Sequence, residues 1–295
     1  MSTDDGHPGV VVGVDGSPGS AVALQWAARD AQLRNVPLTL VHVVPPAAGH
    51  WRDSAMLPPW LHARREMGRR LLEDARRTVT TTIGKTTLET SSVMPSAHAV
   101  SALVDLSKDA DLVVVGCLGA GTLRGRHLGS VSAGVTHYAH SPVAVVHDGT
   151  LPAVDSRAPV LVGIDGSPCA QAAAAIAFDE AAQRGTGVLA LHAWKEVGVF
   201  DSVVSFPRHR WPELYAKEEA VMDEQLAPWR ERYPDVPVRR MIKRGDPAEI
   251  LVDMSASAQL VVVGSHGSGG FAGMLLGSVS AATLLLARVP VIVAR

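Results

Sequence analysis

The stretch GSHGSGGFAGMLLGSVS, Gly264–Ser280, decides the fold of this 295-residue chain. It follows the apolar run QLVVV (259–263), and it places glycines where a buried strand ends and a helix begins. The stretch GCLGAGTLRGRHLGSVS, Gly116–Ser132, has the same arrangement 148 positions earlier. Of the 23 positions in 111–133 and 259–281, 14 are identical, so the two stretches are copies of one unit.

A second pair of segments extends the duplication to nearly the whole chain. VVGVDGSP (11–18) matches LVGIDGSP (161–168) at 6 of 8 positions, and SPVAVVHD near Pro142 corresponds to VPVIVAR near Pro290. Between the copies, DGTLPAVDSRAP (148–159) is polar, aperiodic and contains prolines. We therefore predict a first domain over 1–147, a linker over 148–158 and a second domain over 159–295.

Short β-branched runs alternate with helical patterns in each copy, which favours an α/β fold. Runs as apolar as VVVG are typical of parallel strands that are covered on both faces. Ser17-Pro18 and Ser167-Pro168 are typical of an N-cap followed by the first helical residue. The sequence predicts two tandem, open, doubly wound, Rossmann-like sheets. Their strands are expected at 10–14, 38–44, 88–93, 112–115 and 143–146, and at 160–164, 188–193, 236–242, 260–263 and 291–293.

Composition excludes several classes of protein. Hydrophobic residues make up 47% and charged residues 19% of the chain, which indicates a globular and not a disordered protein. With a net charge of −2, the chain has no overall positive charge that would attract nucleic acid or an anionic membrane. No apolar run reaches the roughly 18 residues of a membrane span. The polar N-terminus does not resemble a secretion signal, and Cys117 and Cys169 form no CxxC, so we expect a cytoplasmic protein.

The glycine stretches point to a phosphate ligand. In open α/β sheets, ligands bind beyond the carboxyl ends of the strands, where the strand order reverses. A glycine loop that leads into a helix N-terminus offers backbone N–H groups to an anion. The Walker pattern with its lysine does not occur, and the dinucleotide fingerprint would follow the first strand, not the fourth. Ser130 and Ser278 open the next helix, and Ser132 and Ser280 are each expected to add a second hydroxyl.

The spacing G-x2-G-x9-G-S after the fourth strand occurs in both halves, with an aspartate ending the first strand and a histidine in the second. In these features the chain resembles the universal stress protein family, in its tandem two-domain type. The resemblance implies five parallel strands in the order 3-2-1-4-5 and one ATP site in each universal-stress-type nucleotide-binding domain. ATP is the implied cofactor, alone or with Mg²⁺.

The resemblance also implies which residues contact the nucleotide. In the first half these are Gly13, Val14, Asp15, Val43, Val115, Gly116, Gly119, Gly129, Ser130, Val131 and Ser132. In the second half the matching positions are Gly163, Ile164, Asp165, Ala193, Val263, Gly264, Gly267, Gly277, Ser278, Val279 and Ser280. The first half departs from the pattern at Cys117-Leu118, where the second half has Ser265-His266.

Several of these residues have a purely structural alternative. Asp15 and Asp165 either cap the following turn or contact the ligand, directly or through Mg²⁺. His42 and His192 are predicted to be core histidines without a catalytic role. Arg124, Arg126 and His127 of the first glycine loop are either solvated or add positive charge near the phosphates.

The function that we expect is an ATP-binding regulator of stress response or growth, with little or no ATP hydrolysis, because neither glycine loop contains a lysine. The expected partners are ATP and a second copy of the chain, or one domain pairing with the other through the last strands. Two alternatives stay open. One is an ATP-cleaving enzyme, adenylating or phosphotransferring, of the same fold class; the other is a structural dimerisation module with vestigial pockets.

Overall fold

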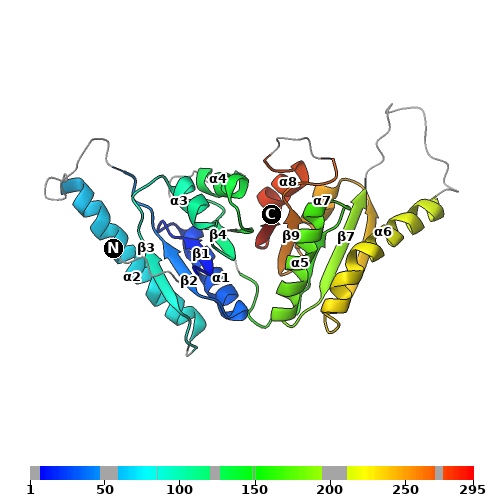
Figure 1. The fold of residues 1–295 in the computed structure, drawn as a ribbon, viewed down its shortest axis with the longest axis horizontal. Helices are drawn as coiled ribbons and strands as arrows, with labels where there is room; N and C mark the ends of the chain where they lie inside the picture. The colour runs from blue at the N-terminus through cyan, green and yellow to red at the C-terminus, as the bar shows by residue number, and fades with distance from the viewer. Residues whose placement is uncertain are drawn as a thin grey trace. The chain divides into compact units, whose positions relative to one another are not determined.

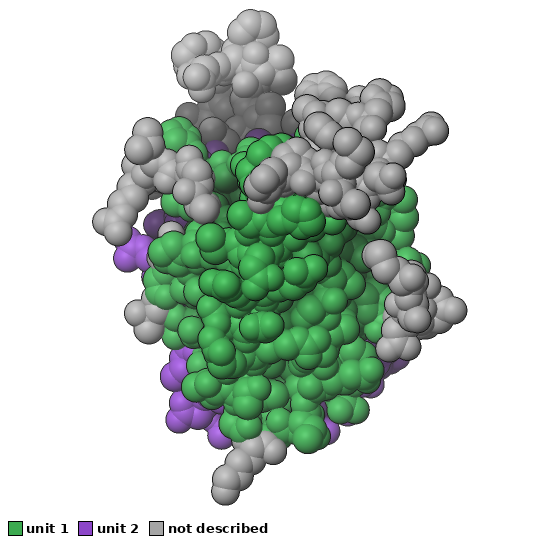
Figure 2. Space-filling model, turned by 90° about the vertical axis from the view of Figure 1, so that its left-hand side faces the viewer, with its two compact units in different colours: residues 1–151 green, residues 152–295 purple. Residues whose placement is uncertain are grey.

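The computed structural model describes residues 7–46, 59–84, 86–119, 127–147, 149, 151–194, 211–269 and 275–295. The chain divides into two compact units, residues 1–151 and 152–295, which Figure 2 colours green and purple. Both units have the same order of elements, and each is a complete α/β sheet with its own helices (Figure 1). The predicted α/β class is therefore confirmed in both halves.

Unit 1 contains five parallel strands in the order β3-β2-β1-β4-β5, which is the predicted 3-2-1-4-5 order. In chain order its elements are β1 (Val10–Gly13), α1 (Pro18–Arg34), β2 (Leu38–Val41), α2 (Pro59–Ile83), β3 (Thr90–Val93), α3 (Ala99–Leu106), β4 (Leu112–Gly116), α4 (Ser130–Tyr138) and β5 (Val143–Val146).

Unit 2 repeats this topology with five parallel strands in the order β8-β7-β6-β9-β10. Its elements are β6 (Val160–Gly163), α5 (Pro168–Gln183), β7 (Val188–Trp194), α6 (Trp211–Arg232), β8 (Val238–Arg244), α7 (Pro247–Ser255), β9 (Leu260–Gly264), α8 (Ser278–Leu286) and β10 (Val291–Ala294).

All ten predicted strands form, and the differences lie at their ends. Strand β8 begins at Val238 and not at Val236, because Pro237 has no N–H to donate to a ladder. Strand β2 ends at Val41, although Val44 still forms an isolated bridge with Ser96.

The middle strands are buried because helices cover both faces of each sheet. Val10, Val11 and Val12 have no exposed surface. At the end of β4, Val115 lies beside Gly13 and Leu103 of α3, whereas the next residue, Gly116, faces α1. Since successive strand residues point to opposite faces, α1 and α3 cover opposite sides of the sheet. The sequence periodicity predicted this double covering.

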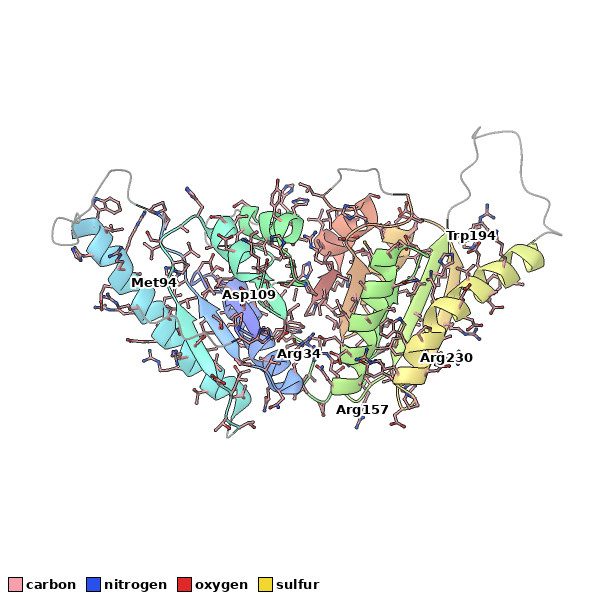
Figure 3. All side chains as sticks on the ribbon, viewed as in Figure 1. Arg34, Met94, Asp109, Arg157, Trp194 and Arg230 are labelled. Atoms are coloured by element: carbon pink, nitrogen blue, oxygen red, sulfur yellow. The ribbon has the colours of Figure 1, made fainter. Side chains whose placement is uncertain are left out.

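Helices α1 and α5 begin in the same way. The Ser17 hydroxyl accepts the Ser20 N–H at 3.1 Å, and the Ser167 hydroxyl accepts the Ala170 N–H at 3.1 Å. Both serines therefore act as the predicted N-caps, each followed by proline at the first helical position. At the other end of α1, Arg34 (labelled in Figure 3) pairs at 2.6 Å with Asp30, whose side chain is fully buried.

Strand β4 and helix α1 approach so closely at Gly116 that a β-carbon would not fit. It would lie 2.7 Å from the carbonyl carbon of Gly19, and at Gly264 of β9 it would lie 2.8 Å from the carbonyl carbon of Cys169. We expect Gly116→Ala or Gly264→Ala to lower the free energy of unfolding by about 1–3 kcal/mol, because the helix must shift. Thermal or denaturant unfolding measures the change.

Gly149→Ala is the control, since a β-carbon at Gly149 meets no atom within 4 Å. Equal stability of the Gly116 and Gly149 variants would contradict the close-packing argument.

Candidate functional site

Each unit has a cavity at the carboxyl ends of its first and fourth strands, where the strand order reverses. In unit 1 the cavity volume is about 320 Å³, and in unit 2 it is about 380 Å³. Both volumes lie within the range of small-molecule sites. The cavities are in the place that the topology of an open α/β sheet favours for a ligand.

The residues predicted from the sequence come together around these cavities. All eleven predicted residues of the first half line the unit 1 cavity: Gly13, Val14, Asp15, Val43, Val115, Gly116, Gly119, Gly129, Ser130, Val131 and Ser132. All eleven of the second half line the unit 2 cavity: Gly163, Ile164, Asp165, Ala193, Val263, Gly264, Gly267, Gly277, Ser278, Val279 and Ser280.

The sequence prediction missed part of each wall. The additional residues are Ser17, Ser20, Val41, His42, Ala99, Leu103 and Leu118 in unit 1, and Ala170, Leu191, Pro247, Leu251, His266, Ser268 and Gly269 in unit 2. The third helix of each unit therefore contributes a pair of residues four positions apart, Ala99 with Leu103 and Pro247 with Leu251. Residues four positions apart lie on the same side of a helix, so this spacing in the sequence could have indicated which side of the third helix faces the sheet.

One end of each cavity is suited to an anion. Helices α4 and α8 begin after Gly129 and Gly277, which have no side chain to cap them, whereas α1, α5 and α7 have side-chain caps. Helix geometry gives no intrahelical partner to the first N–H groups of α4 and α8. Ser130 and Ser278 are exposed at these helix starts and line the cavities. A phosphate placed there meets N–H donors and the positive end of the helix dipole.

Some of the donors in the glycine loops already bond within the protein. The Gly129 N–H donates to the Cys117 carbonyl at 2.8 Å, and the Gly277 N–H donates to the Ser265 carbonyl at 2.7 Å. The Ser132 hydroxyl donates to the same Cys117 carbonyl at 2.9 Å, and the Ser280 hydroxyl donates to the Gly264 carbonyl at 2.6 Å. The hydroxyls of Ser132 and Ser280 thus hold the loop onto the strand end, although we expected each to be a second hydroxyl for the ligand. The first turns of α4 and α8 still offer N–H donors to an anion.

In unit 2, the aspartate that follows the first strand connects the two loops of the site. Asp165 Oδ1 accepts the N–H of Ser167 at 3.0 Å and its hydroxyl at 2.6 Å. The second oxygen, Oδ2, accepts the N–H of Ser268 in the glycine loop at 2.8 Å. In unit 1, Asp15 Oδ1 accepts the corresponding N–H and hydroxyl of Ser17 at 2.9 and 2.6 Å. We call this arrangement the aspartate clasp.

The clasp explains the second glycine of the pattern. A β-carbon at Gly267 would lie 2.5 Å from Asp165 Oδ2, and one at Gly119 would lie 2.9 Å from Asp15 Oδ2. The sequence argument attributed these glycines to the approach of a phosphate. In the structure, the carboxylate of the neighbouring loop occupies that space, so the protein itself requires glycine there.

His42 and His192 have the structural bonds expected of core histidines. Their Nδ1 atoms lie 2.8 Å from the Val14 carbonyl and 2.7 Å from the Ile164 carbonyl, so each Nδ1 carries the proton that is donated. The units differ at the other ring nitrogen. His192 Nε2 lies 3.1 Å from Glu218 of α6, whereas His42 faces Gly68 of α2.

Two predicted contributors, Arg124 and Arg126, lie outside the residues that the structure describes, and His127 is exposed. Within the described residues, no three His, Cys, Asp or Glu side chains are grouped in a way that could hold a metal ion. None of the helices in this part of the chain is both long enough and apolar enough to cross a membrane.

The aspartate clasp predicts that Asp165→Asn loosens the glycine loop of unit 2. An asparagine has one acceptor oxygen, which should stay with the two donors of Ser167, so its NH2 faces the Ser268 N–H and that bond is lost. We expect amide hydrogen exchange over 264–269 to become about tenfold faster, as a lost hydrogen bond of about 1.4 kcal/mol implies. Asp235→Asn, an exposed aspartate of the same unit, is the control. Unchanged exchange in the Asp165 variant would show that the carboxylate does not hold the loop.

Comparison with known proteins places these features in a family. The model of the universal stress protein family matches residues 9–147 and 157–295. The chain is 48% identical over 299 residues to universal stress protein Rv2623 of Mycobacterium tuberculosis, covering 100% of this chain and 99% of the relative. It is 46% identical over 298 residues to universal stress protein Rv2005c of the same species, with the same coverage. A crystal structure of a universal stress protein from Archaeoglobus fulgidus shares the fold, with a TM-score of 0.70, 20% identity and 98% coverage of both chains. The chain belongs to the universal stress protein family, and it carries two domains of that family in tandem.

Proposed function

We propose that each unit binds one ATP molecule and that nucleotide occupancy makes the protein a regulator of stress response or growth. One observation carries the proposal: all eleven residues expected at each nucleotide site line a cavity that ends at an uncapped helix N-terminus. Membership of the universal stress protein family, whose members commonly bind ATP, supports the identity of the ligand.

The cavity walls match the parts of a nucleotide. Val14, Val43 and Val115 form an apolar wall in unit 1, and we place the purine ring against it. The phosphates then extend toward Ser130 and the first turn of α4. In unit 2 the corresponding wall contains Ile164, Ala193 and Val263, and the phosphates extend toward Ser278. Replacement of Val43 by Ala193 gives the purine more room in unit 2.

The donor set fits an indirect contact to Mg²⁺. Among the described lining residues, the carboxylates are those of Asp15 and Asp165. Oδ1 of each aspartate, and Oδ2 of Asp165, accept hydrogen bonds from the protein. We therefore propose that a magnesium ion accompanying ATP would contact these aspartates through water.

The residues that line the two cavities include few groups that could catalyse phosphoryl transfer. Such a reaction needs a group that positions the nucleophile and a positive clamp on the transferring phosphoryl. Neither glycine loop contains a lysine. The ionisable side chains among the described lining residues of the unit 2 cavity are Asp165 and His266, and neither lysine nor arginine is among them. We propose a binding protein with little or no ATP hydrolysis.

We further propose that the functional domains are 1–147 and 159–295 with the linker 148–158, and that the protein acts in the cytoplasm. The free thiols Cys117 and Cys169 fit a reducing compartment. The proposed partner is a second copy of the chain or the other domain. Strands β5 and β10 follow β4 and β9 in the order of their sheets, and each is suited to pair with another unit.

The first test is site-specific loss of nucleotide. Ser130→Asp and Ser278→Asp place a negative charge where the phosphates are proposed to lie, while an acidic residue suits a helix N-terminus. We expect native mass spectrometry to find two ATP molecules per wild-type chain, one for each single variant and none for the double variant. The repulsion should weaken each site by about 30-fold or more, because like charges in contact cost several kcal/mol.

Ser101→Asp adds the same charge near the start of α3, outside the residues that line the cavity, and serves as the control. Two bound nucleotides in the double variant would rule out this placement of the phosphates. The same spectra report the number of chains in each assembly.

The second test is turnover. We expect wild-type protein with labelled ATP and Mg²⁺ to release phosphate or pyrophosphate at less than about 0.01 s⁻¹, the range of nucleotide-binding proteins that lack a complete charge clamp. A Ser130→Asp/Ser278→Asp preparation measures the background from contaminating enzymes. Faster release that disappears in this double variant would favour the alternative of an ATP-cleaving enzyme.

A further inference from the structure

Helices α2 and α6 occupy equivalent positions in the two units but carry opposite charge. Each follows the second strand of its unit and packs on the first helix, α2 on α1 and α6 on α5 (Figure 1). Helix α2 contains six arginines against three acidic residues, whereas α6 contains six acidic residues against three lysines and arginines. The net charges of the two helices are therefore equal in size and opposite in sign.

Each helix buries one side against its own unit and exposes the opposite side. Leu61, Leu72 and Val79 lie on the buried side of α2, and Met222 and Leu226 lie on that of α6. Residues that recur three and four positions apart share one side of a helix, and those opposite the buried residues form an outward stripe on each helix. The α2 stripe is Trp60, Ala63, Met67, Arg70, Asp74 and Arg77, and the α6 stripe is Lys217, Ala220, Glu224, Ala227 and Glu231. Every residue of the two stripes is exposed.

The stripes are complementary in the size of their apolar residues. Trp60 is 49% and Met67 is 68% exposed on α2. Aromatic and methionine side chains are enriched in protein interfaces, where they fill space on the partner. The apolar residues of the α6 stripe are Ala220 and Ala227, whose small side chains leave room for a bulky one.

The stripes are also complementary in charge. Arg70 and Arg77 are seven positions apart on α2, and Glu224 and Glu231 are seven positions apart on α6. Both sets of charges therefore repeat at about 10.5 Å along their helices. When Arg70 lies beside Glu224 in a parallel arrangement, Arg77 lies beside Glu231, and the exposed methionine comes near the level of an alanine.

The internal ion pairs of α2 leave its arginines able to change partner. Arg70 Nε lies 3.4 Å from Glu66 Oε1, with side chains 73% and 51% exposed, and Arg77 pairs with Asp74 on the same exposed side. Exposed ion pairs contribute little to the stability of a fold, because water and salt screen them. A carboxylate of another molecule can therefore compete for both guanidinium groups.

A second copy of the chain has the surface that fits. Its α6 stripe offers carboxylates and small residues to the arginines and large apolar residues of α2. Pairing of α2 with a second α2 would instead bring like charges together, which opposes association. In a two-fold dimer, α2 of each copy meets α6 of the other, so the same contact forms twice.

We infer that two copies of the chain associate through α2 of one copy and α6 of the other, with Arg70 and Arg77 facing Glu224 and Glu231. Neither helix contributes a residue to the described lining of the two cavities, so the inference does not depend on nucleotide binding. The surface is also separate from strands β5 and β10, through which contact was proposed above.

The test reverses the charges of one stripe at a time in the full-length chain. The α2 variant is Arg70→Glu/Arg77→Glu, and the α6 variant is Glu224→Arg/Glu231→Arg. We expect sedimentation velocity to find a wild-type dimer, and the dissociation constant of each variant to be about 100-fold higher or more, because like charges then face each other in both contacts. Far-UV circular dichroism checks that each variant is folded.

Mixing the two variants gives the decisive measurement. In the mixed pair, the glutamates on α2 of one variant face the arginines on α6 of the other, and the second contact keeps the wild-type charges. Native mass spectrometry should therefore find a heterodimer of two proteins that do not dimerise alone. Glu249→Arg/Asp253→Arg makes the same change of charge as the α6 variant, on exposed residues of α7, and this control should dimerise like the wild type.

Three outcomes overturn the inference. A monomeric wild-type chain is the result that pairing within one chain predicts. Variants that dimerise as tightly as the wild type show that the copies meet elsewhere, as at β5 and β10. A mixture without a heterodimer shows that the two stripes do not face each other. The same spectra report bound ATP, so failure of this contact is distinguished from failure of the nucleotide sites.

Discussion

In unit 2, the carboxylate that follows the first strand holds together the two loops from which the site is built. In unit 2, Asp165 accepts three donors, two from Ser167 and one from Ser268, and Ser167 in turn caps α5. One side chain thereby fixes the start of a helix and the position of the glycine loop. Such an interaction needs backbone at contact distance, which is why glycine stands at 267. The shape of the cavity follows from this constraint, since the same loop leads to the N-terminus of α8.

The glycines of the pattern therefore have different physical roles. Gly264 lets the end of β9 lie against the first turn of α5, and Gly267 leaves room for the Asp165 carboxylate. Gly277 leaves the N-terminus of α8 without a side-chain cap. Two of the three glycines are thus required by packing within the protein, and the third lines the cavity. The fold therefore holds the start of α8 in place, which is the preorganisation that the proposed anion site requires.

Because the domain is duplicated, the chain has two cavities. The same aspartate–serine bonds support both, but the side chains that line them differ. Asp15 and Asp165 make matching bonds to Ser17 and Ser167. The side chains around this framework have diverged, as the pairs Leu118 and His266, and Gly68 and Glu218, show. Positions engaged in backbone packing tolerate little change, whereas positions that only line the cavity change at small cost to stability. The two cavities can therefore differ in their walls while the units share one fold.

The sequence by itself determined the duplication, the parallel α/β class and the glycine loops that border each cavity, while the resemblance to a known family supplied the eleven expected residues of each site. Apolar runs, helix caps and glycine spacing are local patterns, and the resemblance to a known family supplied the strand order. Only the tertiary structure decided what the residues do for one another. Asp165 and Ser268 are 103 positions apart, and their bond depends on two strands becoming neighbours. The same holds for the walls contributed by Leu103 and Leu251, and for the hydroxyls of Ser132 and Ser280 that turn to backbone carbonyls. Contacts between segments far apart in the chain are set by how the strands and helices pack, and no local pattern encodes that geometry.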